Sequence, residues 1–183
     1  GEMVWAYLGP DASKLPGGQL PELPQLEFAC IPATHRYVTK QLFECNWAQI
    51  MEGDLDTAHF SFLHMPAPAV PSVYHPHSQA DEKRLRWMRD DPMPLFEVLE
   101  HECGFVVAGA RQADGQKYWR MTQFLLPTHG TGPSTLPGET YHGFTIVPID
   151  DTSCWAYTYS WNPVRPLGND ERDKLHAGWG LIC

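Results

Sequence analysis

The sequence predicts an α+β domain in which one main helix packs on an antiparallel sheet of about five strands. Two observations support this fold class. Apolar side chains recur at helical spacing within residues 46–63. From residue 95 onward, segments rich in β-branched and aromatic residues alternate with short turns. The 183 residues suit one domain with a sizeable core.

The N-terminal part reads as a short strand and a linker. Residues 3–8, "MVWAYL", have a strand pattern, and "LPGGQLPELP" at residues 15–24 is rich in proline and glycine. Proline fixes φ and lacks a backbone donor, so this stretch is neither helix nor central strand. Residues 34–44 alternate well enough for the next strand.

The main helix is expected over residues 46–63. Pro66, Pro68 and Pro71 follow it, so we expect them to end the helix and to start a loop that reaches roughly residue 92. This loop carries mixed charge.

Two hairpins are expected after the loop. Residues 95–112 and 116–127 flank Asp114-Gly115, which is a strong hairpin signal. Residues 140–148 and 153–163 form a second candidate pair of strands. The polar tail at residues 165–178 is compatible with the start of another helix.

Net charge, apolar runs and cysteine content indicate which partners and which cellular location the protein has. The net charge of −9 argues against nucleic acid or an anionic membrane as a partner. No apolar run is long enough to cross a bilayer. The five scattered cysteines predict reduced thiols in a cytoplasmic protein. Both ends stop abruptly in structured-looking sequence, so we expect the chain to be a piece of a longer protein.

An acidic stripe on the main helix is the strongest functional signal. Gln49, Glu52, Asp56 and His59 share one helical face, and His64 follows five residues after His59. A solvated face would explain a polar stripe. However, no lysine or arginine on the stripe balances its acids, and like charges at this spacing are mildly destabilising.

The two histidines indicate a metal site if their rings can meet. On a regular helix, residues five apart point about 140° away from each other. We expect a break between His59 and His64, caused by Pro66, to let both rings face one ion. Asp56 is placed to accept the N–H of a ligating His59. Two imidazoles and a carboxylate are the ligand set of non-haem Fe(II), whereas zinc hydrolases usually space their helical histidines at i, i+4.

These residues carry a family resemblance. The stretch "ECNWAQIMEGDLDTAHFSFLH" resembles the iron-site helix of Rieske non-haem iron oxygenases, in the phthalate-dioxygenase-like branch that includes aromatic O-demethylases. "GEMVWAYLGP" is similar to the end of a Rieske domain, and "LPELPQLEF" to the linker that follows it. "TIVPIDDTSCWAYTYSWNPVRPL" resembles the late strands of the catalytic domain, so the resemblance spans nearly the whole chain.

The resemblance implies a helix-grip fold, in which a curved sheet wraps a long helix. Residues 1–26 would be the tail of a Rieske domain and its linker, and residues 27–183 a C-terminally truncated mononuclear-iron catalytic domain. His59 and His64 would bind Fe(II). Asp56 would bridge to a 2Fe-2S Rieske cluster in the missing N-terminal part or on the neighbouring subunit. Three further polar side chains of the motif would support the site or the electron path: Asn46, Gln49 and Glu52.

Two departures from the family pattern stand out. No cysteine has a histidine two or three residues after it, so no Rieske motif is present. The third iron ligand of the family is an aspartate on a C-terminal helix, which we expect beyond Cys183. Asp170, Glu171 and Asp173 lie too soon after the last strand to be good candidates.

The resemblance implies an oxygenase component that uses O₂ and electrons from a ferredoxin or flavin reductase. The substrate would be aromatic, most simply an aromatic acid, and the assembly a homotrimer. Two alternatives remain open at this stage: a zinc-dependent hydrolase on the same histidines, and a helix-grip module that binds a small molecule without metal. Arg111 and Arg120 would clamp a substrate carboxylate if they pointed inward, but outward-facing arginines are expected.

Overall fold

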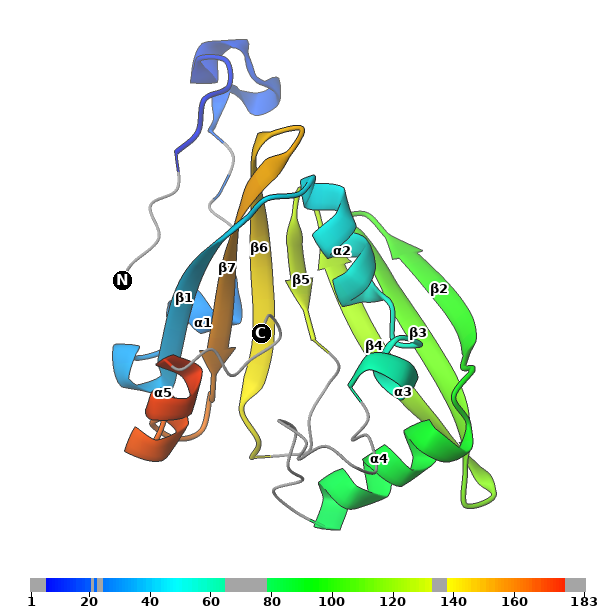
Figure 1. Cartoon of the computed structure of the whole chain (residues 1–183). Helices are drawn as coiled ribbons and strands as arrows, with labels where there is room; N and C mark the ends of the chain where they lie inside the picture. Colours follow the sequence, from blue (N-terminus) through cyan, green and yellow to red (C-terminus); the bar gives the residue numbers. More distant parts are fainter. Residues whose placement is uncertain (1–5, 21, 23–24, 65–78, 133–137, 177–183) are drawn as a thin grey trace.

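Seven antiparallel strands form one sheet in the order β1-β7-β6-β5-β4-β3-β2 (Figure 1). The computed structural model describes residues 6–20, 22, 25–64, 79–132 and 138–176. The strands are β1 Arg36–Phe43, β2 Leu95–His101, β3 Gly104–Ala113, β4 Gln116–Leu125, β5 His129–Thr131, β6 Tyr141–Asp150 and β7 Ser153–Trp161. The helices are α1 Glu27–Cys30, α2 Trp47–Leu55, α3 Phe60–Leu63, α4 Gln79–Asp90 and α5 Asn169–His176. The predicted α+β class and helix-grip arrangement are confirmed.

The two predicted hairpins form at the expected turns. Asp114 (φ 51°) and Gly115 (φ 80°) are both left-handed, as a two-residue type I′ turn requires, and they join β3 to β4. The strands β6 and β7 pair across a short turn at residues 151–152. Strand β1 also forms within the predicted range.

The number of strands was underestimated, because residues 95–112 fold as two strands. The chain turns between β2 and β3, and Gly104 follows this turn with φ 148°. A Cβ on Gly104 would lie 2.1 Å from the carbonyl oxygen of Phe124, so this close approach of two strands needs glycine. The three-residue strand β5 adds the seventh strand.

The expected loop between the main helix and residue 92 contains helix α4, so that prediction is wrong in its second half. The segment that forms α4 contains no proline or glycine, and Leu85 and Met88 stand at helical i, i+3 spacing. Met88 is buried, and both Arg86 and Trp87 donate hydrogen bonds to the carboxylate of Asp114. Packing and these bonds hold the helix against the β3–β4 turn. Pro66, Pro68 and Pro71 lie outside the described residues.

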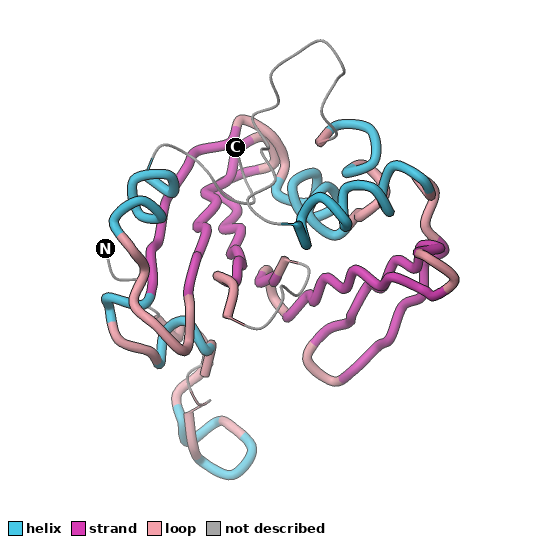
Figure 2. Tube along the Cα trace, turned by 90° about the horizontal axis from the view of Figure 1, so that it is seen from below, coloured by secondary structure: helices cyan, strands magenta, loops and turns pink. Residues whose placement is uncertain are grey.

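The two faces of the sheet carry different cores. Met51 of α2 packs on one face against Phe124, Phe144, Ile146 and other buried side chains. On the opposite face, Phe28 of α1 packs against Tyr159 and Trp161 of β7. Viewed from below, the sheet bends, and the helices α2, α3 and α4 lie inside the bend (Figure 2).

The N-terminal part forms no strand within the described residues. Residues 6–8 of the expected strand have no regular secondary structure, and residues 1–5 lie outside the described part. The expected linker contains two short 3-10 turns, Ala12–Lys14 and Pro16–Gly18. Among the described helices, none combines the length and the apolar character needed to cross a membrane.

Candidate metal centre

The predicted single helix over residues 46–63 is in fact two helices. Helix α2 ends at Leu55, and Asp56 begins a new turn, because its carboxylate accepts the backbone N–H groups of Ala58 (2.8 Å) and His59 (3.0 Å). This is the role of an N-cap side chain. The break therefore lies before His59. The expected break between His59 and His64 is wrong, since both residues have right-handed helical φ and ψ and flank α3.

The two imidazole rings nevertheless lie next to each other. The ring centroids of His59 and His64 are 5.1 Å apart, with an angle of 60° between the ring planes. An imidazole nitrogen binds a first-row metal at about 2.1 Å, so two rings on one ion at about 100° have centroids roughly 5 Å apart. The pair therefore has the spacing that two ligands of one ion need. That the two histidines bind iron stays a prediction.

Asp56 also lies beside the ring of His59. Its Oδ2 is 3.4 Å from His59 Nδ1, which is within ion-pair range but lacks the alignment of a hydrogen bond. The buried Nδ1 thus has no hydrogen-bond partner among the described residues. A small rotation would let Nδ1–H donate to Asp56, which leaves Nε2 as the ligand atom.

The electrostatics favour a neutral ring at His64. Burial lowers the pKa of His64, and the nearby His59 and Arg120 lower that pKa further. A neutral imidazole is the form that binds a metal.

The remaining motif residues are placed away from the ring pair. Asn46 caps α2, since its Oδ1 accepts from Ala48 N (3.0 Å), and its Nδ2 donates to the carbonyl oxygen of Asp151 (3.0 Å). Gln49 and Glu52 are exposed on α2. A role for these three residues in supporting the site or the electron path stays a proposal.

Both arginines of the β3–β4 hairpin point inward, contrary to expectation. Arg111 is 1% exposed and donates to the carbonyl oxygen of Thr57 (2.7 Å). Arg120 donates through Nε to Thr57 Oγ1 (3.0 Å), and its guanidinium lies 4.4 Å from the ring centre of Phe60. Sequence reasoning missed these contacts because the strand register decides which face a side chain occupies.

A hollow opens beside His64. It is lined by Phe60, His64, Leu85, Met88 and Arg120, so that α3, α4 and β4 each contribute to it. Its wall combines three apolar side chains with a guanidinium and an imidazole.

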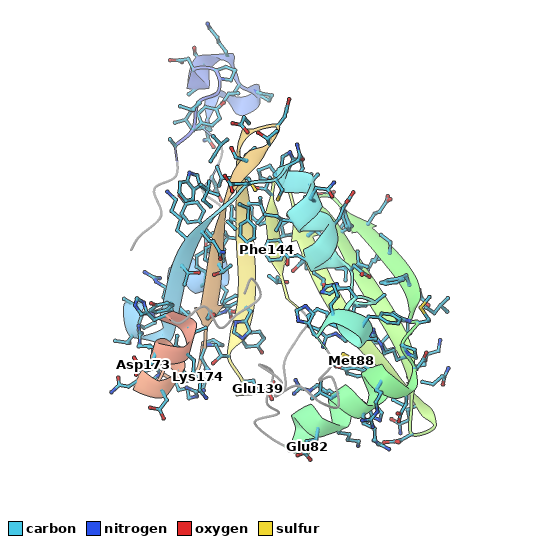
Figure 3. The ribbon with its side chains drawn as sticks, in the orientation of Figure 1. Glu82, Met88, Glu139, Phe144, Asp173 and Lys174 are labelled. Carbon is cyan, nitrogen blue, oxygen red and sulfur yellow. The ribbon has the colours of Figure 1, made fainter. Side chains whose placement is uncertain are left out.

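No third protein ligand accompanies the histidines in the described ranges. Within residues 6–64 and 79–176, leaving aside the gaps, no group of three or more His, Cys, Asp or Glu is close enough to hold a metal. Glu171 instead pairs with Arg165 (2.6 Å) and accepts from Gly168 N and Thr140, and these contacts lower the pKa of Glu171 to about 2. Asp173 lies on α5, across the molecule from Met88 of α4 (Figure 3).

One further carboxyl in this region is unusual. Asp54 stands in α2, and its Oδ2 is buried without a hydrogen-bond partner among the described residues. Burial raises the pKa of Asp54 to about 7. This carboxyl therefore keeps its proton to a higher pH than an ordinary aspartate does.

Comparison with known proteins supports the predicted family. A family model described as "LigXa C-terminal domain like" matches residues 6–175. The chain is 33% identical over 171 residues to the phthalate 4,5-dioxygenase oxygenase subunit of Pseudomonas putida, covering 89% of this chain and 36% of that protein. It is 29% identical over 160 residues to the 3-chlorobenzoate-3,4-dioxygenase oxygenase subunit of Comamonas testosteroni, covering 87% and 34% respectively. The chain thus spans about a third of the length of these relatives.

The fold also matches a solved structure. A crystal structure of dicamba monooxygenase bound to 3,6-dichlorosalicylic acid superposes with a TM-score of 0.54, at 13% identity, over 87% of this chain and 49% of that one. This similarity concerns the fold. Together with the family match, it confirms the resemblance to the phthalate-dioxygenase-like branch. The chain belongs to the LigXa C-terminal domain-like family.

Proposed function

We propose that this chain is the mononuclear-iron part of an oxygenase component that hydroxylates or O-demethylates an aromatic acid. The observation that carries the proposal is the pair of His59 and His64 rings, which are 5.1 Å apart, beside Asp56 and next to a hollow of mixed polarity. The family match and both curated relatives, which are oxygenase subunits, support it. Neither the zinc-hydrolase alternative nor the metal-free binding module gains such support.

The residues present fit two of the protein ligands of a ferrous ion. His59 and His64 would hold the metal through imidazole nitrogens, with the third protein ligand supplied by residues outside the described part. Bound iron would supply the activation of O₂, which the protein side chains cannot provide. The carboxylate of Asp56 would accept a hydrogen bond from His59 Nδ1–H and so hold the orientation of that ring.

We also propose the wider assembly from the family. Residues 1–26 would be the tail of a Rieske domain and its linker, and residues 27–183 the catalytic portion. Asp56 would connect His59 to a 2Fe-2S Rieske cluster on a neighbouring subunit of a homotrimer, and a ferredoxin or flavin reductase would supply electrons. The scattered cysteines favour a cytoplasmic location.

The side chains around the hollow beside His64 have the chemistry to bind an aromatic acid. Arg120 faces this hollow, and only its Nε takes part in a hydrogen bond with the described residues. Its two Nη groups are thus available for a carboxylate, which arginine binds in a bidentate manner. Phe60, Leu85 and Met88 would contact the aromatic ring. Phthalate and 3-chlorobenzoate, which the relatives' names give as their substrates, are both aromatic carboxylates.

The test measures O₂ uptake by the full-length protein with Fe(II), a reductase and NADH, in the presence of benzoate, phthalate and their methyl esters. The proposal expects uptake that depends on a free carboxylate and a KM about tenfold higher or more in Arg120→Gln. Arg120→Lys keeps the charge but loses the bidentate geometry. Its KM should therefore lie between that of the native protein and that of Arg120→Gln. Equal activity on acids and esters would refute the aromatic acid, and activity with Zn(II) in place of Fe(II) would refute the oxygenase.

A further inference from the structure

We propose that Thr57 is the anchor that sets the separation of the His59 and His64 rings, and that Gly109 and Arg111 of β3 hold this anchor in place. The three are positioning residues, since they act on the histidines through the turn between α2 and α3. The inference deepens the proposed function and rests on it only in treating the two histidines as metal ligands.

The first contact that holds Thr57 in place is the steric contact with Gly109. Thr57 is 2% exposed, and its methyl group occupies the space above Gly109. A Cβ built on Gly109 would lie 2.3 Å from Thr57 Cγ2, and its next neighbour, Pro94 Cβ, is already at 3.4 Å. Gly109 has an ordinary negative-φ strand backbone, so glycine is needed here for space and not for conformation. Any larger residue would push Thr57, and the turn that carries it, away from the sheet.

The second set of contacts that holds Thr57 in place consists of hydrogen bonds from Arg111. Arg111 donates through Nη2 to the carbonyl oxygen of Thr57 (2.7 Å) and to Ser61 Oγ (3.2 Å), and through Nη1 to Thr57 Oγ1 (3.3 Å). Its Nε donates to the carbonyl oxygen of Asp91 (3.1 Å), just after α4. One guanidinium on β3 therefore ties together the turn before His59, the helix α3 between the histidines, and the end of α4.

The break in the helix explains why this guanidinium is needed. Because α2 ends at Leu55, the carbonyl oxygen of Thr57 receives no helical hydrogen bond, and a buried carbonyl without a donor is costly. Arg111 supplies that donor. No carboxylate of the described residues forms an ion pair with Arg111. The buried guanidinium is therefore stabilised by neutral acceptors, namely the oxygens of Thr57 and Ser61.

The anchor acts on both histidines. His59 is two residues after Thr57, and Ser61, which Arg111 also holds, lies between His59 and His64 on α3. Arg120 shares Thr57 Oγ1 and lines the hollow beside His64. A shift of Thr57 would therefore move the ring of His59 relative to that of His64, and would release Arg120 at the same time.

A complementary pair of variants tests this directly. Gly109→Ala should displace the turn, and Thr57→Ser should remove the methyl group that the new Cβ meets. Crystal structures of the metal-free protein should show the ring centroids more than 1 Å beyond their 5.1 Å separation in Gly109→Ala. The double variant Thr57→Ser/Gly109→Ala should restore the separation. An unchanged separation in Gly109→Ala, or no recovery in the double variant, would overturn the proposal.

Binding of Co(II), followed by its visible absorption in the full-length protein, gives a second readout. Gly109→Ala and Arg111→Lys should bind Co(II) about tenfold more weakly, and the double variant should recover most of the affinity. The control is Phe28→Leu, which weakens the core on the opposite face of the sheet and should leave Co(II) affinity unchanged. Unchanged Co(II) affinity in folded Arg111→Lys would contradict the anchor. If the native protein binds no Co(II), the proposed function fails, and the ring separations alone still decide the anchor.

Discussion

Asp56 contacts His59 twice: its Oδ2 accepts the backbone N–H of His59 at 3.0 Å and lies 3.4 Å from Nδ1 of the same residue. One carboxylate thus both begins the turn that presents the ring and faces the ring itself. The first role needs only an oxygen acceptor, whereas the second needs a negative charge. These two roles can be separated by mutation.

We expect Asp56→Ala and Asp56→Asn to differ in stability but not in activity. Alanine removes the acceptor for the two backbone N–H groups and should lower the free energy of unfolding by about 1 kcal/mol. Asparagine keeps an acceptor and should cost less than half of that. Both variants lose the charge beside His59, so oxygenase turnover of the full-length protein should be lost in both. Urea unfolding and O₂ uptake measure the two effects, and an active Asp56→Asn protein would show that the charge is not needed.

The buried carboxyl of Asp54 should make stability depend on pH. Its pKa rises from 3.8 unfolded to about 7 folded, so the folded state holds the proton more tightly. The contribution of Asp54 to stability is therefore fully present below about pH 4 and is lost as the pH rises to about 7, by at most about 4 kcal/mol. Asp54→Asn should be more stable than the native protein at pH 8 and similar to it at pH 4.

Urea unfolding at pH 4, 6 and 8 measures this effect. Glu52→Gln removes an exposed carboxylate from the same helix, and its free energy of unfolding should stay within about 0.5 kcal/mol of the native value at each pH. An Asp54→Asn variant that is no more stable than the native protein at pH 8 would contradict the prediction.

The same substitution at two glycines should have opposite effects. Gly115 lies in the β3–β4 turn with φ 80°, so Gly115→Ala should lower the free energy of unfolding by about 1 kcal/mol. Gly53 stands inside α2 with open space around its Cβ position, so Gly53→Ala should raise the free energy of unfolding by roughly 0.5–1 kcal/mol. Thermal unfolding of both variants checks the signs, and a stabilised Gly115→Ala would refute the turn assignment.

Local sequence signals predicted the parts of the fold that local physics determines. Asp114-Gly115 fixed the position of one hairpin, because few residue pairs tolerate two positive φ angles. Helix α4 was missed because its charged residues resemble a loop. The burial of Met88 and the hydrogen bond from Trp87 to Asp114 are tertiary contacts that the local sequence does not show. The split of residues 95–112 was missed although polar residues 100–102 and Gly104 interrupt the apolar pattern, because this turn lacks the Asn-Gly or Asp-Gly pair that marks a two-residue hairpin.

The adjacency of the two histidine rings was predicted, but the side chains that hold them in place were not. The two rings do lie next to each other, as expected, although the break in the helix lies at Asp56, before both histidines, and not between them near Pro66. Thr57 and Arg111 were not expected, since their roles depend on strand register and on a helix break that no local signal places. Long-range contacts of this kind are set by tertiary packing.

The most direct test of the central claim is anomalous diffraction at the iron K edge from crystals of the full-length protein prepared anaerobically with Fe(II). The account predicts one iron peak bonded to imidazole nitrogens of both His59 and His64, and loss of that peak in His59→Ala. An iron peak bonded to only one of these histidines, or to neither, would contradict it.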